Sequence, residues 1–182
     1  MKLNSKLTIA MAAAGIAALG GTAISAQDKT AHDKYALKSP GGIAFADFRG
    51  YEDWVTVSSA RTDDILKVMV SNPTMIKAYR AGVPTNGQTF PEGSKIVKLQ
   101  WKHKKSTEAP FVVEVPDTFS QVFVMEKDSK RFPKTGGWGY AVFNYDPATK
   151  IFSPDAALAD CGQTCHVAVK SKDYIFHNYQ TR

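Results

Sequence analysis

The sequence predicts an α+β fold, a single domain built mainly on an antiparallel β-sheet with a few short helices. Four short stretches rich in β-branched and aromatic residues follow one another between residues 94 and 144, each bounded by Pro, Asp or Gly. Only the stretch that begins at Asn72-Pro73 carries both a start and a stop signal of an α-helix. Since helix is a minority and the strands are regularly spaced, an all-α fold is excluded.

The N-terminus has the pattern of a bacterial export signal. Lys2 and Lys6 precede an apolar run over residues 7–19, and residues 23–26 are small, as a cleavage site requires. We therefore expect a secretory signal peptide over residues 1–26 and a periplasmic protein with no membrane span after cleavage, because the apolar run is short. An uncleaved anchor is the alternative.

The charge balance is mildly basic. The chain has 23 basic and 17 acidic residues; without Lys2 and Lys6 of the signal, 21 and 17 remain, a net charge of +4. No long run of Lys or Arg accompanies it, so we predict no nucleic-acid binding and favour an acidic redox partner. Residues 27–40 are expected to form a polar arm and residues 41–182 one domain.

The first elements of the domain are short. Residues 43–48 predict a short helix with its apolar side chains inward, and residues 51–58 have the composition of a strand. Residues 63–70 fit a buried strand or a helical turn equally well.

The clearest local signal is a helix start. Asn72 is a good N-cap, Pro73 suits the first helical position, and Gly82 lies where a left-handed C-terminal residue is favoured. A helix is therefore predicted over residues 73–81, followed by a loop over residues 84–93.

The chain is rich in β-strand signals from Ser94 onward. Residues 94–102 alternate, so one face carries Val97, Leu99 and Trp101 and the other carries Ile96, Lys98 and Gln100. Further strands are predicted at residues 111–115, 121–126 and 138–144.

The chemical signal of the chain is Cys161-Gly162-Gln163-Thr164-Cys165-His166, which holds its only two cysteines. Each thiol can add to a haem vinyl group, and His166 can then bind the iron, so the motif predicts one covalently bound haem c per chain. The spacer has three residues where two are usual; the extra residue adds little closure entropy, and Gly162 can adopt a positive φ. A Cys161–Cys165 disulfide in a haem-free exported domain is the alternative.

Four stretches in a fixed order resemble the cytochrome P-460 family of exported, β-rich c-type haem proteins. The resemblance spans residues 40–176 and ends around the cysteine motif. The ordered set carries it, since no single stretch is specific. The residues are Trp54 within residues 51–57, the Asn72-Pro73 helix ending in Ala78-Tyr79-Arg80-Ala81-Gly82, Phe90-Pro91-Glu92-Gly93 before Ile96-Val97-Lys98-Leu99-Gln100-Trp101, and Asp173-Tyr174-Ile175-Phe176.

The resemblance implies a sheet-based fold, a haem with an open sixth coordination position and a homodimer. One branch of the family oxidises hydroxylamine and has an extra covalent bond between a strand lysine and the haem ring; an electron-accepting cytochrome is then the partner. A sister branch, cytochrome c-prime-beta, lacks that bond and binds nitric oxide and similar ligands. A non-enzymatic nitric oxide binder or an electron carrier therefore stays open beside an enzyme.

Lys98 is the residue that matches the family's lysine. A neutral amine can attack an activated ring carbon, and burial against a haem would favour that form; the same alternation also describes a solvent-facing lysine. The hydroxylamine-oxidising branch places an acid shortly before the first haem cysteine, where this chain has four apolar residues flanked by Asp155 and Asp160. Either acid fits that role or that of a solvated loop carboxylate.

The remaining histidines and the methionines are candidates for a sixth iron ligand, and Arg80 for a contact with a propionate or a bound ligand, but none has a supporting pattern. The remaining histidines and Arg80 are expected at the surface, the methionines in the core, and the phenylalanines mostly in the core with some lining a haem pocket. They are His32, His103 and His177, Met69, Met75 and Met125, and Phe90, Phe111, Phe119, Phe123 and Phe143.

Overall fold

The computed structural model describes residues 33–158, 161–180 and 182. The predicted signal peptide, the start of the polar arm, His32 and Asp160 lie outside the described residues. Residues 33–40, within the predicted arm, include a short 3₁₀ helix, and Lys38 forms an isolated antiparallel bridge with Ala44.

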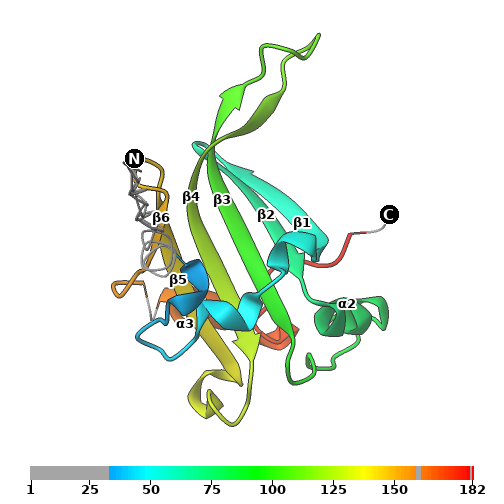
Figure 1. The fold of residues 1–182 in the computed structure, drawn as a ribbon. Helices are drawn as coiled ribbons and strands as arrows, with labels where there is room; N and C mark the ends of the chain where they lie inside the picture. Colours follow the sequence, from blue (N-terminus) through cyan, green and yellow to red (C-terminus); the bar gives the residue numbers. More distant parts are fainter. Residues whose placement is uncertain (1–32, 159–160, 181) are drawn as a thin grey trace, which may run out of the picture.

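The fold is a six-stranded antiparallel sheet in which neighbours in sequence are neighbours in space (Figure 1). This confirms the predicted α+β class with a mainly antiparallel sheet. The strands are β1 (Val55–Thr62), β2 (Ile65–Ser71), β3 (Lys95–Lys105), β4 (Glu114–Lys127), β5 (Trp138–Asp146) and β6 (Ile151–Pro154).

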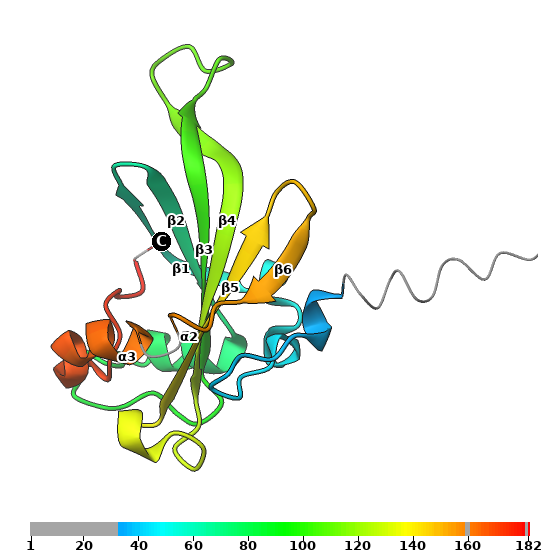
Figure 2. The ribbon, with the colours of Figure 1, turned by 90° about the vertical axis from the view of Figure 1, so that its left-hand side faces the viewer.

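Short helices cover parts of the sheet. Figure 2 shows α3 and the C-terminal segment on one side of the sheet and the first described residues on the other. Within the described ranges, no helix has the length and apolar character needed to cross a membrane. The helices are α2 (Pro73–Arg80) and α3 (Cys161–His166), with 3₁₀ helices η1 (Lys34–Ala36), η2 (Phe45–Phe48), η3 (Tyr51–Asp53), η4 (Pro133–Thr135) and η5 (Val167–Lys172).

Each face of the sheet buries its own apolar cluster. Ile96 and Met125 contribute to the cluster shared with α2, whereas the adjacent Val97 and Val124 contribute to the cluster beneath η2 and η3. Successive side chains of a strand point to opposite faces, so the central strands must be apolar on both. The predicted alternation of β3 is confirmed.

The predicted strand limits were wrong in two regions. The strand predicted over residues 51–58 is β1, which starts only at Val55 because residues 51–53 form η3. The strands predicted over residues 111–115 and 121–126 are parts of the single strand β4, which starts only at Glu114. Residues 111–113 lie outside it, and Phe111 is 72 % exposed near the hairpin tip. Pro116 can lie within β4 because β5 pairs with β4 only from Gln121 onward, so at Pro116 only β3 is a neighbour. Pairing to β1 and β3 makes residues 65–71 a strand, which the local sequence left open.

The predicted N-cap, Asn72, makes tertiary hydrogen bonds in addition to the helix cap. The Asn72 Oδ1 atom accepts hydrogen bonds from the amides of Met75 and Lys95, both at 3.1 Å, and its Nδ2 donates to the Gly93 carbonyl at 2.8 Å. The side chain therefore fastens the start of α2 to the start of β3, which confirms the predicted helix and adds a tertiary contact to it.

We expect Asn72→Ala to lower the free energy of unfolding by about 2 to 3 kcal/mol, because it removes a cap and two further hydrogen bonds. Asn72→Asp keeps the accepting oxygen and should lose clearly less. Urea unfolding of both variants checks this. Equal losses in the two would show that capping is not the main contribution.

Candidate functional site

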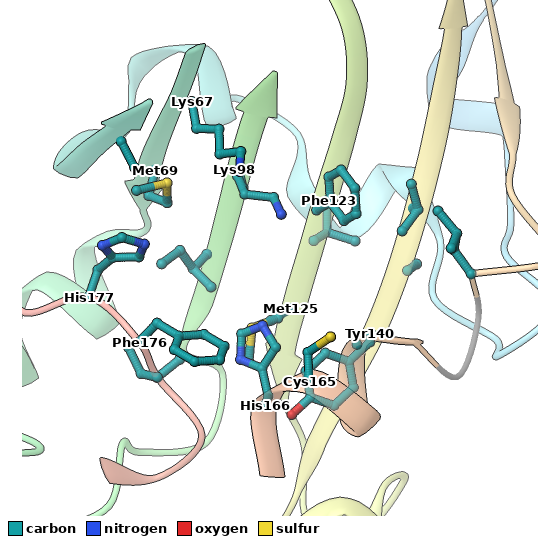
Figure 3. Close-up of a pocket in the computed structure, with 18 residues that line it drawn as sticks. Lys67, Met69, Lys98, Phe123, Met125, Tyr140, Cys165, His166, Phe176 and His177 are labelled. Carbon is teal, nitrogen blue, oxygen red and sulfur yellow. The ribbon is translucent and has the colours of Figure 1, made fainter. Parts of the chain in front are cut away.

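A pocket opens on the face of the sheet that α3 and the C-terminal segment cover (Figure 3). Strands β1 to β5 supply one wall, and α3 with residues 175–177 supplies the other. Most of the lining is apolar. Its ionisable side chains are Lys67, Lys98, Tyr140, Cys165, His166 and His177, and no carboxylate lines the pocket among the residues that the structure describes.

Three predicted site residues from distant parts of the sequence meet in this pocket. Lys98 comes from β3, and Cys165 and His166 come from α3. Figure 3 shows the Lys98 amine and the His166 ring both directed into the pocket, with the Cys165 sulfur beside them. The side chain of Cys161 lies outside the described part of the chain.

The three-residue spacer between the two cysteines lies within helix α3. Residues four apart lie on one helix face, so positions 161 and 165 face the same way. The structure describes the Cys165 side chain, which is exposed and free of a disulfide.

Gly162 serves this helix by its lack of a side chain. It is helical rather than in a positive-φ loop, so the conformational role expected for it is wrong. A Cβ atom there would lie only 2.5 Å from the Tyr140 ring. The glycine therefore lets α3 approach β5 closely enough to bring Cys165 and His166 to the pocket.

His166 is held in one tautomer and one orientation. Its Nδ1 atom lies 2.5 Å from the Tyr174 carbonyl oxygen, which can only accept, so Nδ1 carries the proton and Nε2 keeps a free lone pair. The ring also packs against Tyr140 and Phe176. Burial lowers the pKa of His166, outweighing the Tyr174 hydrogen bond, and the Lys98 charge lowers it further, which favours the neutral form that binds metals.

Lys98 lies in the pocket and not on a solvated face. Its Nζ atom is 3.6 Å from the centre of the Phe123 ring on the neighbouring strand. Burial lowers the pKa of Lys98 to about 8, and the charge of Lys67 contributes to the decrease. The neutral form of this amine is therefore a minor but populated form near physiological pH.

His177 is the pocket residue that the sequence pattern missed. It lines the pocket with Lys67 and Met69 at the end away from Cys165 (Figure 3). Its pKa is lowered by burial first and then by the charges of Lys98 and Lys67. It directly follows Phe176, where the family-like stretch ends, and that adjacency was the only available signal.

The other candidates divide between the pocket and the rest of the fold. Met69, Met125 and Phe123 line the pocket. Met75 is buried in the cluster with α2, His103 contacts the Asp63 carbonyl, and Arg80 is exposed.

Asp155 is engaged in the loop before α3. Its carboxylate accepts hydrogen bonds from the Asn144 side chain at 2.9 Å and from the amides of Ala157 and Leu158 at 3.0 and 3.2 Å. Leu158, not Asp155, lines the pocket. The structure therefore gives Asp155 a loop-ordering role.

The part of the chain that forms this pocket matches a known protein family. The model of the family described as Cytochrome P460 matches residues 48–177, which include every described residue of the pocket. The chain belongs to the cytochrome P460 family. No match was found among curated proteins.

Membership of the cytochrome P460 family places the chain among haem-binding cytochromes. No group of three or more His, Cys, Asp or Glu side chains that could hold a metal ion occurs in the described ranges. A haem brings four nitrogen ligands of its own, so a single histidine such as His166 can complete the protein's share of the coordination.

The lowered pKa of Lys98 predicts a pH-dependent effect on stability in chain produced without haem. Below pH about 8 the folded state carries a charge that is costly to bury, so Lys98→Met should stabilise the fold there, by at most about 3 kcal/mol. The difference should shrink between pH 8 and 10.5, where the unfolded chain retains the proton that the folded wild type has lost. Urea unfolding of both proteins across this range checks it, and a difference that does not vary with pH would contradict it.

Proposed function

We propose that the chain is a periplasmic mono-haem c-type cytochrome that binds or oxidises small nitrogen species such as hydroxylamine or nitric oxide. In this proposal Cys161 and Cys165 form thioethers to the vinyl groups, and His166 binds the iron through Nε2. The observation that supports it most is the His166 ring, fixed by the Tyr174 carbonyl with its free nitrogen in an apolar pocket beside Cys165. The export pattern at residues 1–26 supports the compartment.

The residues of the pocket suit a haem at both of its edges. The vinyl and propionate groups of a haem lie on opposite edges, so a macrocycle anchored at Cys165 directs its propionates away from that residue. Lys67 and His177 occupy the far end of the pocket (Figure 3), and no described carboxylate neutralises them there. We assign these two residues to the propionates.

The chain's own groups limit what the pocket can do. When bound, the haem supplies redox chemistry and an open coordination position. Phe123, Met69 and Met125 give the pocket an apolar lining, which limits the access of water. With Asp155 engaged in its loop and His177 assigned to a propionate, the described group available to accept a proton from a bound ligand is Lys98, whose pKa is lowered.

The state of Lys98 bears on which of the two candidate functions, hydroxylamine oxidation or ligand binding, the pocket supports. Its neutral amine is the form that can bond to an electrophilic ring carbon, which supports the hydroxylamine-oxidising alternative. Among the described residues no carboxylate lines the pocket, which supports the second candidate, a non-enzymatic nitric oxide binder or electron carrier. For an oxidising enzyme we also propose an electron-accepting cytochrome as partner, and a homodimer as the assembly.

Haem attachment is tested in chain exported with the c-type maturation machinery. We expect haem to stay on the wild-type chain after denaturation, and the double variant Cys161→Ser/Cys165→Ser to lose it. His166→Ala should retain the thioethers but change the axial ligation. Pyridine haemochrome absorbance and the ferrous spectrum measure both. A colourless wild-type protein would overturn the proposal, and Asp155→Asn serves as the matched control outside the pocket.

The role of Lys98 is tested by mass spectrometry of the haem peptide. If Lys98 is joined to the ring, the β3 peptide should co-purify with the cysteine peptide in wild type and separate in Lys98→Arg, while the covalent haem content stays unchanged. Steady-state hydroxylamine oxidation with an artificial acceptor should fall in the same variant. An unmodified Lys98 peptide in wild type would favour the ligand-binding alternative.

A further inference from the structure

A buried ion pair lies beside the turn that holds His166. The Lys127 Nζ and Asp173 Oδ1 atoms are 2.8 Å apart, and the two side chains are only 6 % and 4 % exposed. Lys127 also donates to the Gly136 carbonyl at 2.9 Å, and Asp173 Oδ2 accepts from the amide of Phe90 at 2.8 Å. The pair therefore joins the end of β4, the η4 loop, the segment before β3 and the turn after η5.

The turn itself has a backbone that needs support. Asp173 and Tyr174 have φ values of +48° and +64°, two consecutive residues in the left-handed region that side chains disfavour. The Tyr174 ring is buried against Gly136, where a Cβ atom would lie 2.2 Å from ring atom Cε2. Such a conformation persists only where its surroundings hold it.

This backbone decides where the Tyr174 carbonyl points. That carbonyl is the acceptor for His166 Nδ1, at 2.5 Å. If the turn relaxed to an ordinary backbone conformation, the carbonyl would rotate away and His166 would lose the contact that selects its tautomer.

We propose that the Lys127–Asp173 pair is a positioning element for the iron ligand: it fixes the turn so that the Tyr174 carbonyl holds the Nδ1 proton of His166 and leaves Nε2 free and more basic. This role rests on the proposed function in that His166 binds iron. A buried ion pair adds little to stability over an apolar pair of similar size. The pair joins four segments at the turn, and this positioning role explains why two charges are buried there.

The test in the haem protein is the iron–histidine stretching frequency of the ferrous form, measured by resonance Raman. In Asp173→Asn we expect a lower frequency and a higher reduction potential, because a ligand whose Nδ1 proton is held less strongly donates less charge to the iron. A wild-type frequency in the folded variant would overturn the proposal.

Glu126→Gln is the matched control. Glu126 precedes Lys127 on β4, its side chain is 9 % exposed, and it pairs with Arg131 at 2.7 Å. Losing this pair should lower stability and leave the iron–histidine frequency unchanged, because the described contact of the Glu126 carboxylate is with Arg131 and not with the turn at Asp173 and Tyr174. An equal frequency shift in both variants would attribute the effect to general destabilisation and overturn the proposal.

Two further arms keep the outcome decisive. If Asp173→Asn does not fold, Lys127→Met/Asp173→Asn removes both charges together and avoids an unpaired buried one. The same downward shift is expected, and a wild-type frequency would overturn the proposal.

In full-length chain produced without haem, the imidazole ¹⁵N shifts of His166 should report one tautomer in wild type and a mixture in the variant. This arm remains valid if no haem is attached, so failure of the proposed function is distinguishable from failure of the positioning role.

Discussion

The pleat of the central strands is the constraint on which the rest of the structure depends. Because β3 and β4 are covered on both faces, adjacent residues such as Ile96 and Val97 belong to two different apolar clusters. One face packs beneath η2 and η3. The other face can then be left partly open, and its residues Lys98 and Phe123 form the floor of the pocket. A shift of one residue in β3 would move Lys98 to the opposite face, and the same shift in β4 would move Phe123 there, so either shift would abolish the site.

The second wall of the pocket is less regular, and its position depends on close contacts. Helix α3 has only six residues and packs against β5 through the close approach of Gly162 to the Tyr140 ring. The segment that follows passes through η5 and two left-handed residues before it returns to the pocket as Phe176 and His177. Short helices have little stability of their own, so the orientation of His166 is determined by the contacts of this segment with the sheet.

Charge within the pocket distinguishes it from an ordinary apolar cavity. Lys67, Lys98 and His177 lie together without a described carboxylate. Burial and the neighbouring cations lower the pKa of Lys98 and that of His177. Such an arrangement raises the cost of leaving the pocket empty and favours a ligand that brings negative charge at that end. In the proposed haem protein the propionates supply that charge, while the neutral form of Lys98 stays available to the ligand side.

The sequence by itself determined the fold class, the alternation of β3, the helix that begins at Asn72 and the motif that ends at His166, since each rests on local periodicity or on adjacent residues. It could not determine that residues 114–127 form one strand, because tolerance of Pro116 depends on where β5 stops. It also left Lys98 between surface and site, assigned Gly162 the wrong role and gave His177 none. Only the tertiary structure decided these, because they depend on which segments far apart in the chain come into contact, and local sequence does not encode those distances.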